Sequence, residues 1–254
     1  MEFTLLDAVW LPLIAVWAGA LNAVAGGGTF FTFPLLILGG IPPVAANATS
    51  KVGLWIGAVG SVRGYWSEIK EAKAWLLVIL TLSVIGSAIG SVLLLLIPAE
   101  RFAALVPWLM LAATASFALG PYARKALQQY TQPSRAGRGL AYAMQLLIGV
   151  YAGFFGAGIG ILMLALYEWM GLKNIHVMNG LKVAAAVAAH TISSLILVFS
   201  ALIVWPAALI IMAFSFAGGY GGAYIAKRLP AIWIRRFIIV YGVIVTLYFF
   251  AAGT

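Results

Sequence analysis

Cysteine is absent from the 254 residues of the chain, and only 8% of the side chains are charged. The lack of cysteine excludes disulfide bonds, thiolate metal sites and cysteine nucleophiles. The six Asp and Glu residues lie in loops or near the ends of apolar stretches, so a cation site built from carboxylates is poorly supported. Paired carboxylates, a histidine cluster and a phosphate loop with its lysine are also missing. We therefore predict neither an enzyme nor a metal or other cofactor.

Apolar residues, in contrast, make up 64% of the chain, and its mean hydropathy is +1.08. Such a chain cannot cover itself with polar surface in water. Charge is absent from 8–50, 74–99, 102–123, 139–167 and 237–254, and 183–226 contains only His190. Each window is long enough for one or two membrane crossings of about 20 residues. These runs predict an all-α polytopic membrane protein in the lipid bilayer.

The formal net charge of +9 could suggest a nucleic-acid partner. The Lys and Arg residues, however, lie in short loops between the apolar runs. In that position they act as determinants of topology and as contacts for anionic lipid headgroups. We expect no nucleic-acid partner.

Two structural repeats are suggested when the second half of the chain is aligned on the first with an offset of 131 residues. Gly27 then matches Gly158, and Lys51 matches Lys182. With one inserted residue, Gly86 matches Gly218 and Gly90 matches Gly222. We predict a first transmembrane repeat at 1–122, a basic cytoplasmic linker at 123–137 and a second repeat at 138–254.

The apolar pattern predicts about ten spans, five in each repeat. They are expected at 8–25, 29–40, 44–64, 74–97, 102–121, 139–155, 159–171, 175–199, 205–226 and 235–252. This arrangement places every loop Lys and Arg except Arg101 on one face, whereas re-entrant glycine segments with four crossings per half would divide them almost equally. An odd number of spans makes the repeats inverted, with both termini outside.

Two glycine-rich stretches interrupt these apolar runs: A-G-G-G-T at 25–29 and G-F-F-G-A-G-I-G at 153–160. The apolar run at 29–40 would be about 18 Å long as a helix, too short to cross alone, so extended glycines would add the missing reach. Each break would present the N-terminus of a short helix to the middle of the bilayer, where it attracts an anion. Alternatively, these glycines only allow helices to pack closely.

Lys51 and Lys182 lie about seven residues inside predicted spans and, in inverted repeats, approach the midplane from opposite faces. A charge at that depth is costly and usually functional, although a flexible lysine can also reach its nearest interface. Polar and glycine residues accompany both lysines and suit the oxygens of a small anion. The candidate substrate-binding residues are Asn22, Gly26, Gly27, Gly28, Thr29, Asn47, Thr49, Ser50, Lys51, Gly156, Gly158, Gly160, Asn179 and Lys182.

His190 lies inside a span and has an imidazole side chain, which titrates near neutral pH. It is therefore a candidate for coupling transport to protons. A hydrogen-bonded contact between helices is the alternative role for this residue.

Several motifs in this order resemble the TauE/SafE family of membrane permeases, over nearly the whole chain. They are A-G-x-x-N-A-x-A-G-G-G-T (18–29), F-P-L-L (33–36), A-N-A-T-S-K-V (46–52), G-x-x-x-G-F-F-G-A-G-I-G (149–160), N-G-L-K-V (179–183) and G-x-x-x-G (218–222). The resemblance implies transport of small sulfur-containing anions, such as sulfite, sulfoacetate or another organosulfonate, across a bacterial-type cytoplasmic membrane. It implies a secondary transporter, expected to be an exporter that works by alternating access.

Two other functions stay open at the level of sequence: a non-transporting membrane scaffold or assembly factor, and a passive anion channel. The sequence does not indicate the exact substrate, the coupling ion or the oligomeric state. It also does not indicate whether Lys51 and Lys182 face one cavity.

Overall fold

The computed structural model describes residues 5–127, 135–225 and 231–252. All regular secondary structure within these ranges is helical. A helix occupies each of the ten ranges expected to be apolar spans. The helices are α1 (Leu5–Ala25), α2 (Thr29–Leu38), α3 (Pro43–Gly64), α4 (Trp66–Glu71), α5 (Lys73–Leu96), α6 (Ala99–Leu127), α7 (Arg135–Phe154), α8 (Ile159–Trp169), α9 (Ile175–Val198), α10 (Trp205–Ile225) and α11 (Ala231–Ala252). Helices α6 and α7 extend into the linker predicted at 123–137, and residues 128–134 of that linker lie outside the described residues.

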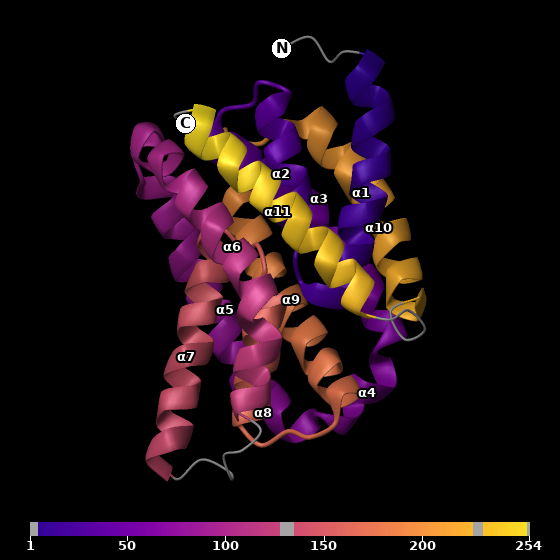
Figure 1. Ribbon diagram of the computed structural model, residues 1–254, viewed down its shortest axis with the longest axis vertical. Helices are drawn as coiled ribbons and strands as arrows, with labels where there is room; N and C mark the ends of the chain where they lie inside the picture. The colour runs from indigo at the N-terminus through magenta and orange to yellow at the C-terminus, as the bar shows by residue number, and fades with distance from the viewer. Residues whose placement is uncertain (1–4, 128–134, 226–230, 253–254) are drawn as a thin grey trace.

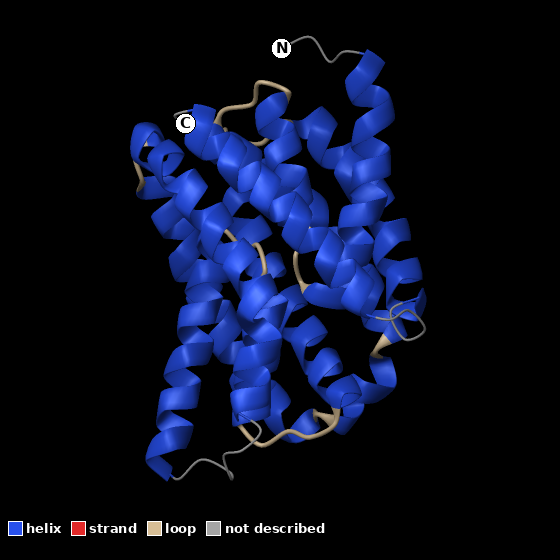
Figure 2. Cartoon of the chain, in the orientation of Figure 1, coloured by secondary structure: helices blue, strands red, loops and turns tan. Residues whose placement is uncertain are grey.

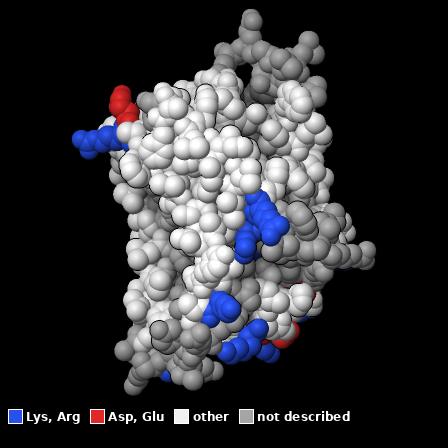
Figure 3. Space-filling view, viewed as in Figure 1, with Lys and Arg blue, Asp and Glu red and all other residues white. Residues whose placement is uncertain are grey.

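Four segments of the described chain are long and apolar enough to cross a membrane: Lys73–Leu96, Ala99–Ala123, Ile175–Val198 and Arg235–Ala252. Large apolar side chains also point outward along these helices, for example Leu77, which is 78% exposed. Such a surface suits lipid rather than water. On the face drawn in Figure 3, Lys and Arg side chains lie mainly in the lower half. The chain is thus an integral membrane protein.

Helices α1 and α2 form a hairpin. A side chain at Gly28 would meet the Ala18 carbonyl oxygen at 2.7 Å and the Asn22 Cβ at 3.3 Å. A helix that continued in one direction would separate residues ten positions apart by about 15 Å, so the chain must reverse at the glycines. In Figure 1, α2 returns to the end of the bundle at which α1 begins.

Helices α7 and α8 form a second hairpin, which enters the bundle from the opposite end (Figure 1). The loops at the two hairpin tips both lie near mid-height inside the bundle (Figure 2). The glycines therefore reverse the chain rather than extend the reach of α2 and α8. The remaining long helices, α3, α5, α6, α9, α10 and α11, pass across the bundle.

Small residues form two corresponding seams, each between a helix of the first half of the chain and a helix of the second half. Helix α5 packs along α7, and the position of a Cβ at Gly90 is filled by the α7 backbone at Val150. Helix α10 packs along α1, and the position of a Cβ at Gly218 is filled by the α1 backbone at Val16. Without side chains at these points the helix backbones approach closely, which is the usual way helices associate in membranes.

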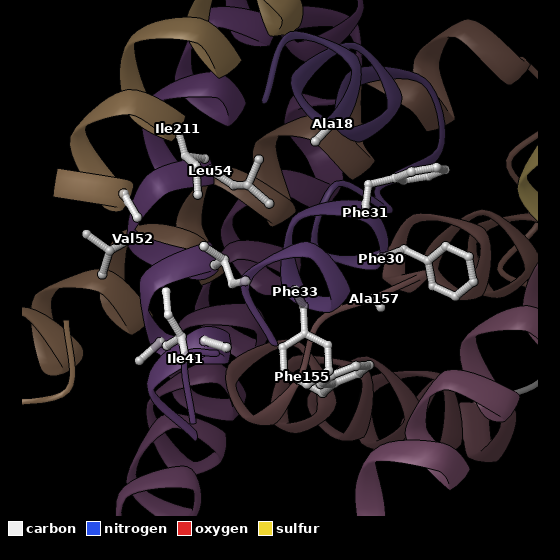
Figure 4. Close-up of a cluster of buried hydrophobic side chains, with 14 of the residues drawn as sticks. Ala18, Phe30, Phe31, Phe33, Ile41, Val52, Leu54, Phe155, Ala157 and Ile211 are labelled. Carbon is white, nitrogen blue, oxygen red and sulfur yellow. The ribbon is translucent and has the colours of Figure 1, made fainter. Parts of the chain in front are cut away.

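An aromatic core lies around α2. The Phe31 ring stacks on Tyr241 of α11, with centroids 4.3 Å apart, and the Phe33 ring meets Phe155 edge-on at 5.2 Å. Figure 4 shows Phe30, Phe31 and Phe33 together with Phe155 and Ala157 of the second tip. Burial of these large rings fixes α2 in the bundle although it is only 10 residues long.

Helix α4 was not expected from the apolar pattern, because it is short and polar. It packs on α9, and the Cβ position at Gly180 lies 2.8 Å from the Glu68 backbone. Trp66 is exposed, and the Lys70 ammonium lies 5.4 Å from its ring centroid. This composition is typical of a helix at a membrane interface.

Candidate functional site

The two hairpin tips contact each other in the middle of the bundle. Gly26 has a φ of +67°, and a Cβ at this residue would lie 2.6 Å from the Gly160 backbone nitrogen. Gly156 and Gly158 also have positive φ, at 89° and 76°. Side chains rarely adopt this conformation, so glycine allows both the reversal of the chain and the contact between tips.

Lys182 binds the end of α1 from the other half of the chain. Its Nζ donates to the Ala23 carbonyl at 3.1 Å, to the Val24 carbonyl at 2.7 Å and to the Asn179 Oδ1 at 3.0 Å. The last carbonyls of a helix have no partner within the helix and carry the negative end of its dipole. A buried ammonium at this position therefore caps α1.

Lys51 makes the corresponding contact in the opposite direction. Its Nζ donates to the Ala152 carbonyl near the end of α7. The next carbonyl, that of Gly153, accepts a bond from the Ser91 Oγ at 3.4 Å. The Phe154 carbonyl after it accepts a bond from the Asn47 Nδ2 at 2.8 Å. Three successive carbonyls at the end of α7 are thus bound by side chains of α3 and α5.

This geometry changes the expected role of the lysines. From the sequence we placed both beside the helix N-termini that would hold an anion. The structure places each ammonium on a helix C-terminus, just before the break that leads to α2 or α8. The two positive groups therefore lie at the tips, but their first contacts in this structure are with backbone carbonyls.

The other predicted residues divide into two groups. Asn22, Thr29 and the glycines at 26–28, 156, 158 and 160 form or adjoin the tips. Thr49 instead accepts a bond from the Val204 backbone nitrogen at 3.0 Å, before α10. Ser50 shares a 2.5 Å hydrogen bond with Thr32 of α2. Thr49 and Ser50 thus join helices in this structure.

His190 of α9 is buried. One turn further along α9, the buried Ser194 Oγ has no hydrogen-bond partner. The Asn47 Oδ1 is likewise buried without a partner. Buried polar atoms without partners are rare in proteins, so Asn47 and Ser194 each offer an unused hydrogen-bonding group.

Sequence reasoning missed Thr32, Ser87 and Ser91. The Ser91 Oγ donates to Ser193 at 2.8 Å, and Ser87 donates to the Ala189 carbonyl at 2.7 Å, so both connect α5 to α9. A signal was present, because Ser83, Ser87 and Ser91 recur every four residues beside Gly86 and Gly90. This spacing places the hydroxyls along one face of α5.

An apolar groove of about 670 Å³ lies between α5 and α6. Arg101 and Trp108 line it, and so does Phe154, the last residue of α7. The groove thus reaches from the lipid-facing surface to the base of the second tip. In the described part of the chain, no group of three or more His, Asp or Glu side chains could hold a metal ion.

Lipid-facing helices and two broken helices that meet at mid-height define a polytopic α-helical membrane protein with paired discontinuous segments. Residues 11–249 match the sulfite exporter TauE/SafE family, and the chain belongs to that family. The resemblance found in the sequence motifs is therefore confirmed, and the chain is a member of a transporter family.

The aligned parts of individual relatives are 27–29% identical to this chain. A probable membrane transporter protein of Haemophilus influenzae is 27% identical over 242 residues, which are 90% of this chain and 89% of the relative. ORF9 of a Sinorhizobium species, also a probable membrane transporter protein, is 29% identical over 153 residues, 59% of this chain and 57% of the relative. YfcA of Escherichia coli K12, a probable membrane transporter protein, is 27% identical over 154 residues, which are 59% of this chain and 55% of the relative. The matches thus span little more than half the length of the last two relatives, and no solved structure matches the chain.

Proposed function

We propose that the protein is a secondary transporter that exports a small sulfur-containing anion, such as sulfite, sulfoacetate or another organosulfonate. The observation that carries this proposal is the meeting of two hairpin tips at mid-height, each with a buried lysine supplied by the opposite half. Discontinuous helices near the midplane are the usual substrate sites of secondary transporters. The family and the printed names of the relatives support transport, and the family description supports a sulfur anion.

The proposed architecture is two inverted repeats. The pattern of contacts supports it: Lys51 of α3 binds α7, while its counterpart Lys182 of α9 binds α1. The α5–α7 and α10–α1 seams correspond in the same way. In Figure 1, the two hairpins enter from opposite ends of the bundle. Each repeat then consists of one hairpin and three helices that cross the membrane. Because three is an odd number of crossings, the second repeat is inverted relative to the first, and ten complete spans are not needed.

The proposed location is the cytoplasmic, or inner, membrane of a bacterial-type cell, with both termini outside. The arrangement of loop charges supports this orientation, because cytoplasmic loops carry an excess of Lys and Arg. In Figure 1, α1 begins and α11 ends at the same end of the bundle. That end is opposite the one at which α6 ends and α7 begins, on either side of the predicted basic linker.

Alternating access in this architecture is a movement of one repeat against the other. The tips contact through Gly26 and Gly160, and the lysine bonds cross from one half to the other. Opening toward either face would separate the tips and exchange lysine contacts with carbonyls for contacts with an anion. A small oxyanion is suited to this exchange, because it offers the same kind of acceptor oxygens as the carbonyls.

Uptake of labelled sulfite, sulfoacetate and sulfate into proteoliposomes, with and without an imposed proton gradient, tests the proposal. Saturable accumulation against a concentration gradient is expected. Flux that only dissipates a gradient would identify a passive channel instead. No flux and no binding of any sulfur anion would contradict the proposal and favour a membrane scaffold.

Gly27→Ala separates a transporter from a scaffold. A Cβ at Gly27 would lie 2.6 Å from the end of the Phe117 ring, a side chain that can shift. We expect this variant to fold and to lose flux, since the tips could no longer move freely past Phe117. Gly139→Ala is the matched control, because nothing lies within 4 Å of that position.

A further inference from the structure

The two buried lysines differ in how completely they are hydrogen-bonded. An ammonium has three N–H groups. Lys182 has three acceptors, Ala23, Val24 and Asn179. Lys51 has one acceptor, the Ala152 carbonyl, although its side chain is completely buried. Lys51 therefore retains donor capacity that Lys182 has used.

Asn47 adds an unused acceptor one turn away from Lys51 on α3. Its Nδ2 donates to the Phe154 carbonyl at 2.8 Å. A carbonyl can only accept, so this bond determines which end of the amide is nitrogen. The remaining Oδ1 is buried without a partner. An oxygen in this position requires a hydrogen-bond donor.

Ser194 adds an unused hydroxyl from the facing helix. Helices α3 and α9 pack together and run in opposite directions (Figure 1). The Ser91 hydroxyl bonds the Gly153 carbonyl at the end of α7, at 3.4 Å, and Ser193 of α9, at 2.8 Å. The part of α9 that contains Ser194 therefore lies at the level of the carbonyls that Lys51 and Asn47 bind. Asn47 is one turn before Lys51, and Ser194 is one turn after His190, so both are displaced toward the same end of the bundle. The unpartnered Asn47 Oδ1 and Ser194 Oγ thus border one region.

Two of the polar residues around Lys51 align with apolar residues of the other half. With the offset of 131 residues, Asn47 corresponds to Met178 and His190 corresponds to Val59. Met178 belongs to an apolar core cluster. Asn47 and His190 therefore align with apolar residues, and they are not required to cap a broken helix.

We infer that the ligand subsite lies at the second tip, between Lys51, Asn47 and Ser194, and that its ligand is a small oxyanion that still carries one proton. The unused N–H groups of Lys51 and the hydroxyl of Ser194 donate to the anionic oxygens. The ligand's own O–H donates to the Asn47 Oδ1, which neither sulfate nor fully ionised sulfite can do. Hydrogen sulfite has this chemistry. The inference rests on the proposed function and narrows it to one tip and one protonation state.

Calorimetric titration of the purified full chain in nanodiscs, with sulfite and with methanesulfonate across a pH series, tests the inference. Methanesulfonate has one negative charge and no proton to donate, so its pH profile reports the titration of the protein, including Lys51 and His190. We expect hydrogen sulfite to bind about tenfold more tightly than methanesulfonate, the effect of one hydrogen bond to a buried group. Above the pKa of hydrogen sulfite, the affinity for total sulfite should fall about tenfold per pH unit relative to methanesulfonate.

Asn47→Leu should remove the preference for hydrogen sulfite and leave methanesulfonate binding unchanged. Met178→Leu, at the corresponding position near Lys182, is the matched control and should change neither. Ser194→Ala should weaken both anions about threefold to tenfold, because it removes a donor shared by both. Lys51→Met should abolish binding, whereas folded Lys182→Met protein should lose much less affinity.

Two results would overturn the inference while leaving transport in place: sulfite binding that does not weaken with pH relative to methanesulfonate, or an Asn47→Leu protein that keeps the preference. Both results are expected if Lys51, Asn47 and Ser194 bind only a water molecule. If proteoliposomes accumulate no sulfur anion and the wild type binds none, the proposed function fails as well. Flux of the wild type therefore separates the two failures. If Asn47→Leu does not fold, Ser194→Ala still tests the inference, because unchanged binding of both anions by this variant would contradict it.

Discussion

The two hairpin tips are built alike but differ in how their polar groups are used. At each tip a glycine break follows a helix whose last carbonyls are bound by a lysine of the opposite half. At the first tip, Lys182 finds three acceptors, and its neighbours in the described part of the chain add no unpartnered polar atom. At the second tip, the ends of Lys51, Asn47 and Ser194 keep unused capacity. The comparison suggests one tip that is mainly structural and one that can exchange its contacts for a ligand.

The largest effect is expected where the two tips touch. Gly26→Ala combines a positive φ with a Cβ 2.6 Å from the Gly160 backbone. Backbone strain and overpacking together should destabilise the protein by about 2–5 kcal/mol. Thermal unfolding in detergent measures this loss. Gly221→Ala is the control, because nothing lies within 4 Å of it, and an unchanged Gly26→Ala protein would show that the tips do not meet in this way.

The next effect separates the lysines. Lys182→Met leaves two carbonyls of α1 without a donor, whereas Lys51→Met leaves one carbonyl of α7. We expect destabilisation by about 1–3 kcal/mol for Lys182→Met and by less for Lys51→Met. Transport should show the reverse order, with the larger loss for Lys51→Met. Unfolding midpoints and flux per folded molecule check both, and equal effects in both assays would remove the distinction between the tips.

A smaller effect is expected at the second tip from Ser91→Ala. The change removes the bonds that connect α5 to Gly153 of α7 and to Ser193 of α9. Loss of stability should be about 1 kcal/mol. The exposed Ser67, bonded only to the neighbouring Glu68, offers a matched Ser→Ala control that should be neutral. If Ser91→Ala leaves the stability unchanged, the hydrogen bond from α5 does not help to fix the end of α7.

The smallest effect on stability is expected at His190, where the question is coupling. With the offset of 131 residues His190 aligns with Val59, so proton coupling through His190 would have no counterpart in the first half of the chain. His190→Ala should flatten the pH dependence of transport near the range in which imidazole titrates. Flux into proteoliposomes across a pH series measures this. A profile identical to that of the wild type would exclude His190 from coupling.

Much of the fold could be predicted from sequence, because glycine, proline and charge interrupt the apolar runs near the ends of the helices. The prediction at 44–64 and helix α3 at Pro43–Gly64 differ by one residue at the start. The direction of the chain after each break could not be predicted. A glycine with positive φ permits either continuation or reversal, and contacts far along the sequence decide, such as Phe31 with Tyr241.

The candidate site was predicted only in part, for a related reason. Buried lysines stand out in an apolar sequence, and so do the glycines of the tips. Their partners are backbone carbonyls, which every residue has and which leave no mark in the sequence. The asymmetry between Asn47 and Met178 was visible in the alignment of the two halves, but it gained meaning only when the Asn47 Oδ1 was found without a partner.

The crossed lysines have a consequence for how such a chain could have arisen. Neither half contains the lysine that caps its own hairpin, because Lys51 caps α7 and Lys182 caps α1. If the two halves are the proposed inverted repeats, a half-length ancestor would have needed a second copy of itself, inserted in the opposite orientation, to complete either tip. Fusion of two such copies would make that pairing permanent, and one tip could then lose polar side chains while the other kept them.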